Sequence, residues 1–459
     1  MLDANLVTSN EHTPALRVTP LQKGHSSTRP QPTSPLERGA RRAGCVWLHV
    51  GTVLDGTSTA PMRDTHVVYD ATTIRFVGRD GRTPPREFLR DDQTAPDFDA
   101  PDFTLLPGLT DAHAHLFLEG GELNLDRRAA YLKQTPAELL QAARARLEQL
   151  VRLGVIAVRD AGDKDGVGLA LSKLSKTDER PLMPYVEGPG AAIHHRGRYG
   201  SFMGAPLEDF PSPRACVEDR VRAGADRIKL IPTGIINFKQ GAVTTEPQMT
   251  TAEVSELVAA ATSFGKQTFA HASGDTGIDR VIAGGVDSVE HGFFIRDDQL
   301  ALMRDRHIAW VPTFAPVQEQ VDHADLMGWD APVVANLQRI LDAHAASLVR
   351  AHALGVAIVA GSDAGSVGVA HGFGLLSELE LMEHAGLPSL AVLNAATGTG
   401  ANRLAYREKF GRIGPGWLSR FILTRHSPLE TVTNLRRPRT IVFDGQVFET
   451  DEHADNTGL

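Results

Sequence analysis

The strongest constraint on the fold is the alternation of short apolar runs with longer amphipathic segments across residues 105–362. Apolar runs of this length predict buried strands, and the segments between them have the length and period of crossover helices. Eight strands are predicted in this way, over residues 105–116, 155–159, 183–187, 227–231, 267–272, 288–291, 309–314 and 356–362. Eight parallel strands joined by helices favour a (β/α)8 barrel, in which functional side chains lie at the C-terminal ends of the strands.

Two of the helical segments carry start and stop signals. Thr135 and Glu138 have the spacing of a capping box, in which each side chain accepts a hydrogen bond from the other residue's backbone amide. The same pattern recurs at Thr250 and Glu253. Two glycines are expected to end these helices, Gly154 and Gly265.

Both ends of the ordered chain have the composition of β-structure. Runs such as "VWLHVGTVLDG" and "DTHVVYDATTIRFVG" are rich in β-branched residues and predict short antiparallel strands. Near the other end, Asp444 and Gly445 separate two apolar runs and predict a hairpin. We expect residues 44–104 and 405–450 to form one small β-domain, with the barrel of residues 105–404 inserted between its two parts.

The terminal segments differ from the rest of the chain in composition. Residues 1–43 are rich in Ser, Thr, Pro and Arg without a sustained apolar period, which predicts a disordered leader or a segment upstream of the true start. Residues 451–459 are expected to form a flexible tail.

Composition argues against several classes of function. A formal net charge of -9, without a cluster of Lys and Arg, argues against nucleic-acid binding. Apolar runs stay short of the roughly 18 residues that span a bilayer, so we expect no membrane partner. The two cysteines, Cys45 and Cys216, are too few for a disulfide framework and fit a reducing cytoplasm. We therefore expect a cytoplasmic protein that acts on a small molecule. We also expect it to form a homo-oligomer.

The stretch "LLPGLTDAHAHL" suggests a metal site. It places His113 and His115 on one face of the first predicted strand, because side chains two residues apart in a strand point the same way. Such a pair suits a metal, but it also suits a strand cap with a solvated neighbour. Four further ligand-type residues stand at other predicted strand ends: Lys229, His271, His291 and Asp363. Each has an ordinary structural interpretation alone, but together at one barrel mouth they indicate two divalent cations.

Lys229 is the unusual member of this set, because an ammonium group repels metal ions. A buried amine loses its proton more easily, and the neutral amine adds carbon dioxide to give a carbamate with two oxygens. That anion would bridge the two cations.

The motifs "PGLTDAHAHL", "GADRIKLIPTG", "AHASG", "SVEHG" and "AGSDAG", taken in order, resemble the amidohydrolase superfamily over about residues 44–450. The similarity is greatest to its imidazolonepropionase-related and Xaa-Pro dipeptidase-like members. It implies a distorted (β/α)8 TIM barrel with a small β-sandwich domain built from both chain ends, and a centre of two divalent metal ions, usually zinc. One departure is the "SRF" of residues 419–421, where family members commonly carry Ala-Asp-Leu, and it bears on packing of the small domain.

The resemblance also implies a role for each residue that matches a motif. These roles are His113, His115 and Asp363 as ligands of the more buried ion, His271 and His291 as ligands of the second, and Lys229 as the bridging N6-carboxylysine. The implied reaction is hydrolysis of an amide, dipeptide or cyclic amide C–N bond by a metal-bridging hydroxide, with Asp363 as the proton shuttle.

Other reactions remain alternatives. A deaminase of the same superfamily is one, but deaminases mostly use one metal and lack the bridging lysine. The bridging hydroxide would also attack a lactone or a phosphotriester. A non-enzymatic scaffold is disfavoured by the complete ligand set.

The loop predicted after the third strand, "EGPGAAIHHRGRYGSFMG", is dense in groups that handle ligands. In dipeptidase-like relatives this loop carries a histidine that helps polarise the substrate carbonyl, and His194 or His195 would take that role here. Arg196, Arg198 and Tyr199 are predicted to hold a substrate carboxylate. The same composition also fits a solvated glycine loop with charged ends.

Overall fold

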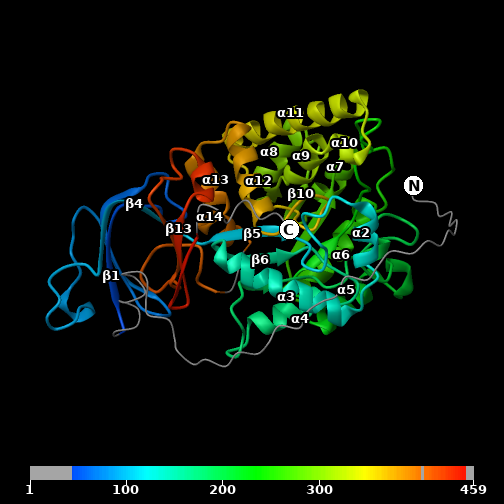
Figure 1. Cartoon of the computed structure of the whole chain (residues 1–459). Coiled ribbons are helices and arrows are strands. Elements are labelled where there is room, and N and C mark those ends of the chain that lie inside the picture. The colour runs from blue at the N-terminus through cyan, green and yellow to red at the C-terminus, as the bar shows by residue number, and fades with distance from the viewer. Residues whose placement is uncertain (1–43, 405–407, 451–459) are drawn as a thin grey trace, which may run out of the picture.

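The computed structural model describes residues 44–404 and 408–450 of the chain. A seven-stranded sheet built from both chain ends lies beside a larger part in which helices surround parallel strands (Figure 1). The expected leader of residues 1–43 and the expected tail of residues 451–459 lie outside the described residues.

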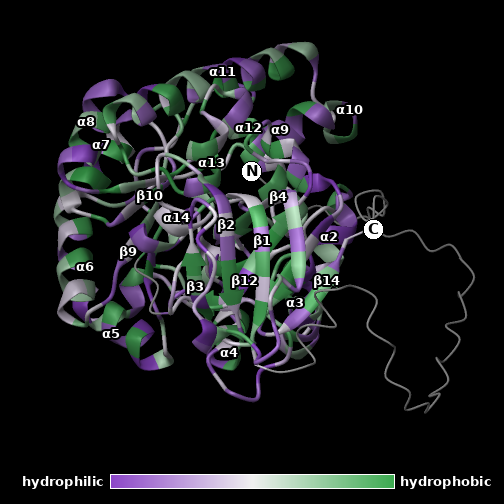
Figure 2. Cartoon of the chain, turned by 90° about the vertical axis from the view of Figure 1, so that its left-hand side faces the viewer, coloured by the Kyte–Doolittle hydropathy of each residue, from purple (hydrophilic) through white to green (hydrophobic). Residues whose placement is uncertain are grey.

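The seven-stranded sheet joins the first and last strands of the described chain. Its order is β14-β13-β12-β4-β1-β2-β3, with β1 and β4 parallel and the other neighbours antiparallel (Figure 2 views the molecule from this side). The strands are β1 (Val46–Val53), β2 (Met62–Tyr69), β3 (Ile74–Gly78), β4 (Phe98–Pro107), β12 (Arg420–Thr424), β13 (Arg439–Phe443) and β14 (Gln446–Glu449). In place of the β-sandwich expected from the resemblance, the described strands of the two chain ends form one hydrogen-bonded sheet.

The predicted hairpin at Asp444 and Gly445 is confirmed. Phe443 pairs with Gln446, and the two residues between them have φ values of 47° and 75°. Positive φ at both central positions is what a type I′ turn requires, and Gly445 adopts it without steric cost.

Two parallel sheets form the strands of the larger part. One contains β5 (Leu109–Ala114), β6 (Val155–Asp160) and β7 (Tyr185–Glu187), and the other contains β8 (Ile228–Leu230), β9 (Thr268–Ala272), β10 (Ser288–His291) and β11 (Ala309–Val311). The loop after β7 reaches the second sheet at Ile193, whose amide donates to Lys229 O at 2.9 Å and whose carbonyl accepts from Ile231 N at 3.0 Å. The arrangement is barrel-like, but the hydrogen-bonded ladder is not a single closed sheet in the described residues.

The eighth predicted strand, over residues 356–362, is not a strand in the structure. The segment lies between β11 and β5 and forms isolated bridges, such as Ile358 with Trp310. Further along, the amide of Ser362 donates to the Asp111 carboxylate at 2.9 Å instead of to a neighbouring strand. A side-chain acceptor therefore replaces the regular ladder at this point.

The strand predicted over residues 105–116 is two strands. Leu105, Leu106 and Pro107 belong to β4 of the seven-stranded sheet, where they pair with β12, and β5 begins at Leu109. Gly108 lies between them, and its amide donates to Arg420 O at 3.0 Å. One continuous apolar run therefore passes from one sheet to the other, which the run itself does not reveal.

The helices lie outside the parallel strands (Figure 1). They are α2 (Leu125–Tyr131), α3 (Pro136–Arg152), α4 (Val167–Ser175), α5 (Pro213–Ala223), α6 (Thr251–Ser263), α7 (Asp275–Gly284), α8 (Asp297–Asp305), α9 (Ala315–Asp322), α10 (Ala324–Met327), α11 (Ala331–Leu354), α12 (Phe373–His384), α13 (Ser389–Ala395) and α14 (Gly398–Arg403). Both predicted capping boxes are present, at the starts of α3 and α6. Among the described helices, none combines the length and the apolar character needed to cross a membrane.

Candidate active site

A cavity of about 360 Å³ opens at the C-terminal ends of the parallel strands. Strands β5, β8, β9 and β10 each direct at least one polar side chain to it, and the segment after residues 356–362 adds a carboxylate. The six residues predicted as metal ligands all line this cavity: His113, His115, Lys229, His271, His291 and Asp363. The fold therefore brings together groups that are far apart in the sequence.

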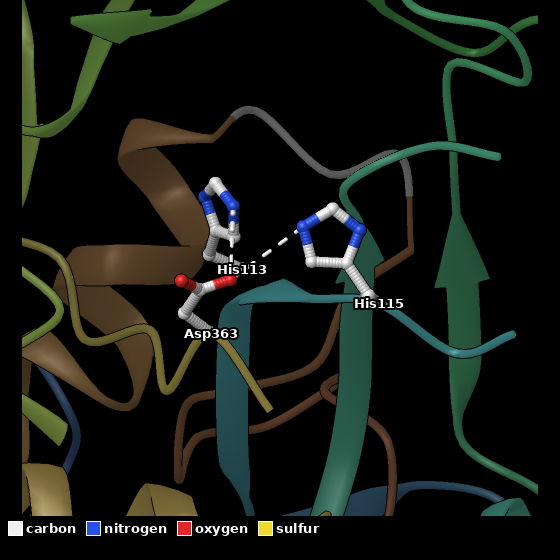
Figure 3. Close-up of side chains that lie close together, drawn as sticks. All are labelled: His113, His115 and Asp363. Carbon is white, nitrogen blue, oxygen red and sulfur yellow. Dashed lines mark ion pairs between the residues drawn. The ribbon is translucent and has the colours of Figure 1, made fainter. Parts of the chain in front are cut away.

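Three of these side chains, His113, His115 and Asp363, lie close enough to share one metal ion (Figure 3). One potential ligand atom from each lies within 4.8 Å of the others. Asp363 Oδ1 is 3.6 Å from His113 Nε2 and 3.5 Å from His115 Nε2, while Oδ2 accepts a hydrogen bond of 3.2 Å from Ser366 Oγ. Two imidazole nitrogens and one carboxylate oxygen are ligands that zinc commonly takes.

The other two histidines lie against this group. The ring centroids of His271 and His291 are 4.5 Å apart, and those of His113 and His291 are 5.0 Å apart. Lys229, buried on β8 with Nζ 4.8 Å from the centroid of the Phe269 ring, lines the same floor of the cavity. These three side chains therefore lie at the same cavity as His113, His115 and Asp363.

Each of the four histidines has one ring nitrogen held by the protein. His113 Nδ1 is 2.6 Å from Glu290 Oε2, and His291 Nδ1 is 2.7 Å from Thr313 Oγ1. The remaining two histidines place one ring nitrogen 3.4 and 3.3 Å from backbone carbonyl oxygens. His113 Nε2 is buried and has no hydrogen-bond partner among the described residues. A histidine with one nitrogen held and the other free is oriented as metal-binding histidines are.

Burial keeps these imidazoles neutral. It is the largest cause that lowers the pKa of His115 and His271 to about 3, and it holds the pKa of His113 and His291 well below the ordinary value. The neutral ring is the form that binds a metal. Burial also raises the pKa of Asp363 to about 7, against the attraction of the nearby lysine. An uncompensated carboxylate here is costly, which favours a cation beside it.

A buried ionic network lies beneath His113 and was missed in the sequence. Arg159 donates to Glu290 Oε2 at 2.7 Å and to Ser288 Oγ at 3.1 Å, and Ser288 Oγ donates to Glu290 Oε1 at 2.6 Å. The available signal was a charged residue inside each of two strand-like apolar runs, "VIAVRD" and "SVEH". A charge in such a run must be paired when the strand is buried.

Strained backbone occurs at three of the positions that meet at the site. His291, Thr313 and Asp363 have φ values of 67°, 52° and 52°. Non-glycine residues rarely adopt positive φ, and a β-branched residue such as Thr313 does so only when its surroundings enforce it. Asp111 contributes to this enforcement by accepting hydrogen bonds from both the amide and the hydroxyl of Ser362, at 2.9 and 2.5 Å.

His194 and His195, predicted to polarise the substrate carbonyl, are not among the residues that line the cavity. His194 is buried with its ring nitrogens 2.9 Å from Gly204 O and 3.0 Å from His195 O. His195 places Nδ1 2.8 Å from Glu208 Oε1 and Nε2 3.2 Å from a carboxylate oxygen on α6. The loop folds back on itself, and both rings bind their own surroundings.

Of the three residues predicted to hold a substrate carboxylate, only Tyr199 lines the cavity. Arg196 forms an ion pair with Asp209, and Arg198 donates to the backbone oxygen of Glu246, so neither arginine lines the cavity. Tyr199 does line it, with its ring centroid 5.2 Å from that of His271. Burial, followed by the nearby carboxylate of the site, raises the pKa of the Tyr199 hydroxyl, which therefore stays a neutral hydrogen-bond donor.

The outer wall of the cavity is largely apolar. Its side chains come from the loops after β5, β7, β8 and β10 and from α9: Leu118, Phe202, Ile235, Ile236, Phe238, Phe293 and Val317. Ligand pockets commonly combine such a wall with a few convergent polar groups.

Comparisons with known proteins agree with this architecture. An Xaa-Pro dipeptidase solved with methionine in its active site superposes with a TM-score of 0.72 at 26% identity, over 88% of this chain and 100% of that one. The ochratoxinase of Aspergillus niger is 23% identical over 432 residues, which cover 88% of this chain and 86% of the ochratoxinase, and its crystal structure superposes with a TM-score of 0.71. An uncharacterized protein of Mycobacterium tuberculosis is 26% identical over 294 residues, 64% of this chain and 72% of that protein. The sequence model of the Amidohydrolase family matches residues 104–448, so the chain belongs to the amidohydrolase family.

Proposed function

We propose that the protein is a metal-dependent hydrolase that cleaves the C–N bond of an amide, a dipeptide or a cyclic amide. The observation that carries the proposal is the meeting of four histidines, Lys229 and Asp363 at one cavity. The buried His113 Nε2, which lacks a partner among the described residues, supports it because an orphaned nitrogen there costs free energy until a ligand binds it.

The residues fit two divalent cations, and we assign each a place. His113, His115 and Asp363 would hold the first ion, and His271 and His291 the second. Neutral imidazoles and a carboxylate suit zinc better than a hard cation such as magnesium, which prefers oxygen ligands throughout. Lys229 would lie between the two sets as a carbamate.

The carbamate forms without any other reactant than carbon dioxide. Burial is the main cause that lowers the pKa of the Lys229 ammonium to about 8, so the neutral amine is accessible near neutral pH. Its nitrogen attacks the carbon of carbon dioxide, the new C–N bond forms, and the nitrogen releases one proton to solvent. The resulting carbamate carries one negative charge shared by two oxygens. This anion takes the place of the buried ammonium cation of the unmodified lysine.

When bound, the cations supply a water molecule acidic enough to lose its proton near pH 7, and they polarise the substrate carbonyl. Asp363 would accept that proton and deliver it to the leaving nitrogen. Ser366 Oγ donates to Asp363 Oδ2, which keeps Oδ1 directed toward Nε2 of His113 and Nε2 of His115. General acid–base catalysis of this kind contributes roughly 10²- to 10⁴-fold in rate.

One of the similar proteins supports cleavage of a C–N bond as the reaction. The Xaa-Pro dipeptidase, which superposes over 88% of this chain, is named for a peptide bond that it cleaves. The bridging role proposed for Lys229 favours two metals over the single metal of most deaminases.

The test is a substrate panel assayed with zinc-loaded protein, before and after removal of metal by a chelator. The panel contains N-acyl amino acids, Xaa-Pro dipeptides, hydantoins, lactones and phosphotriesters. We expect turnover in at least one of the three C–N classes, lost with the metal and regained on adding zinc. Turnover confined to lactones or phosphotriesters, or C–N cleavage that survives complete metal removal, would contradict the proposal.

A further inference from the structure

The cavity contains a positively charged side chain, that of Arg128, which has no role in the proposed reaction. Arg128 and Lys229 are the two cationic side chains among the described residues that line it. Lys229 lies on the floor beside the metal-binding groups, whereas Arg128 belongs to α2, at the side of the cavity. Most of the remaining outer lining is apolar, so the guanidinium provides charge where little else does.

Arg128 is held in place by uncharged groups. Its Nη1 donates to Glu119 O at 2.5 Å and its Nη2 donates to Gly365 O at 2.7 Å. Gly365 is two residues beyond Asp363, so the guanidinium is fastened next to the proposed site of chemistry. Backbone carbonyls orient the group without cancelling its charge, and three of its five N–H donors remain for a ligand.

The nearby acidic residues do not form an ion pair with Arg128. Glu119 and Glu122 are the carboxylates close enough to affect its pKa, and they raise it. Burial has the larger effect and lowers that pKa from the usual value. Glu122 pairs instead with the neighbouring Arg127, at 3.5 Å. In the described residues no carboxylate oxygen lies within 4.0 Å of the Arg128 guanidinium nitrogens, whereas Arg127, Arg159 and Arg227 each have such a partner.

We propose that Arg128 binds an anionic group of the substrate, so that the enzyme selects molecules in which a carboxylate accompanies an apolar body. This inference rests on the proposed function for its chemistry. A half-buried guanidinium without a counter-ion gains more from a carboxylate than an exposed one does, because the surroundings screen the charge less. Arg128 thus takes the role that the sequence assigned to Arg196 and Arg198, whose side chains are engaged outside the cavity.

The test uses two compounds that differ only in a carboxylate, N-benzoyl-L-leucine and N-isopentylbenzamide. Hydrolysis of either adds water across the benzoyl–nitrogen bond and releases benzoate, so one assay follows both. We expect the zinc-loaded wild-type enzyme to favour the acid by about 10- to 100-fold in kcat/KM, mainly through KM, which is the strength of a charge-assisted hydrogen-bonded contact. Arg128→Met should lose most of this preference and keep kcat/KM for the neutral compound within about 3-fold of wild type.

Two further variants separate binding from structural support. Arg128→Lys keeps the positive charge and should retain part of the preference for the acid. Arg127→Met removes the exposed neighbouring charge on the same helix and should change neither substrate. Equal losses on the acid and on the neutral compound in Arg128→Met would show a structural role and overturn the inference.

A binding measurement keeps the inference testable if neither compound is hydrolysed. Isothermal titration calorimetry of the zinc-loaded wild-type protein and of Arg128→Met, with each compound, measures affinity without turnover. Acid-selective binding that depends on Arg128, without turnover of the wider substrate panel, would contradict the proposed function alone. Hydrolysis of both compounds alike, or no selective binding of the acid to the wild type, would overturn the inference about Arg128.

Discussion

At the scale of single residues, the site depends on ligands in which the ring nitrogen or carboxylate oxygen that faces away from the metal position is held by a neighbouring side chain. Glu290 holds one nitrogen of His113, Thr313 holds one nitrogen of His291, and Ser366 holds one oxygen of Asp363. Each ligand is therefore oriented before a metal arrives, and the ordering cost is met during folding. A substitution that changes a single atom of one of these ligands should therefore lower kcat more than it lowers the stability of the fold.

Asp363→Asn is the clearest such change. The amide has nearly the same shape but cannot accept and return a proton, so we expect the folded protein to persist while kcat falls to less than about a tenth of the wild-type value. Circular dichroism and steady-state kinetics measure the two properties. Retention of more than a tenth of kcat would refute the role of proton shuttle.

Lys229→Ala tests the bridging role. Loss of the amine removes the proposed carbamate, so zinc content and activity should fall together, and a short carboxylic acid in solution should partly restore both. Reconstitution of the wild-type apoprotein with zinc should also be faster with bicarbonate, because carbamate formation consumes carbon dioxide. An unmodified amine in the electron density of a fully active crystal with two metals would contradict this role.

At the scale of elements, the loop after β8 forms part of the cavity wall and is clamped by α11. Asn336 Nδ2 donates to the backbone oxygens of Phe238 and Lys239 at 3.3 and 3.0 Å. Phe238 lines the cavity, and its ring lies edge-on to Trp329 with centroids 6.0 Å apart. The clamp therefore fixes an apolar wall for the substrate.

Asn336→Ala should loosen this wall without touching the metal ligands. Loss of two hydrogen bonds of about 1 kcal/mol each predicts a rise of about 3- to 30-fold in KM, with unchanged zinc content. Gln338→Ala is the matched control, because its amide contacts Asp342 on the exposed surface of the same helix. A similar KM in both variants would mean that the loop does not need the clamp.

The sequence predicts those elements whose signals are local. The capping boxes of α3 and α6 and the hairpin at Asp444 and Gly445 depend on neighbours within four residues, and all are present. Features set by distant partners were not predictable. The division between β4 and β5 depends on pairing with β12, and the irregular segment at residues 356–362 depends on the Asp111 carboxylate.

The site follows the same rule. Ligand-type residues at strand ends were recognisable, because parallel strands bring their C-terminal ends to one edge. The course of the loop that carries His194 and Arg196 was not recognisable. It is set by contacts of these side chains with Gly204, Glu208 and Asp209 further along the same loop. Arg128 was not recognised because a helix residue of this kind is ordinarily a surface charge.

At the scale of the whole molecule, the seven-stranded sheet packs against the turn between α3 and β6. Gly154 in this turn has a φ of +85°, and a Cβ added there would lie 2.6 Å from Cδ1 of Ile422 on β12. Gly265 occupies the corresponding place after α6, with a φ of +65° and no atom within 4 Å of an added Cβ. Comparing substitutions at these two glycines distinguishes the cost of backbone strain from the cost of a steric clash between the two parts of the fold.

Gly154→Ala should therefore destabilise the protein more than Gly265→Ala. Both substitutions force alanine into left-handed backbone at a cost of about 1–2 kcal/mol, and only the first adds overpacking of about 1–3 kcal/mol. Urea unfolding measures the difference, and kcat should be unchanged in both. Equal losses of unfolding free energy in the two variants would show that Ile422 on β12 moves aside without cost, and would contradict this prediction.

The central claim is that the cavity holds two metal ions on six protein side chains, and the metal content of the purified protein tests it most directly. Elemental analysis by mass spectrometry, after growth with zinc and removal of loosely bound metal by gel filtration, gives the number of ions per chain. We predict a value close to two, because burial keeps the four imidazoles neutral and the protein orients them before a metal binds. One ion per chain, or none, would contradict the account.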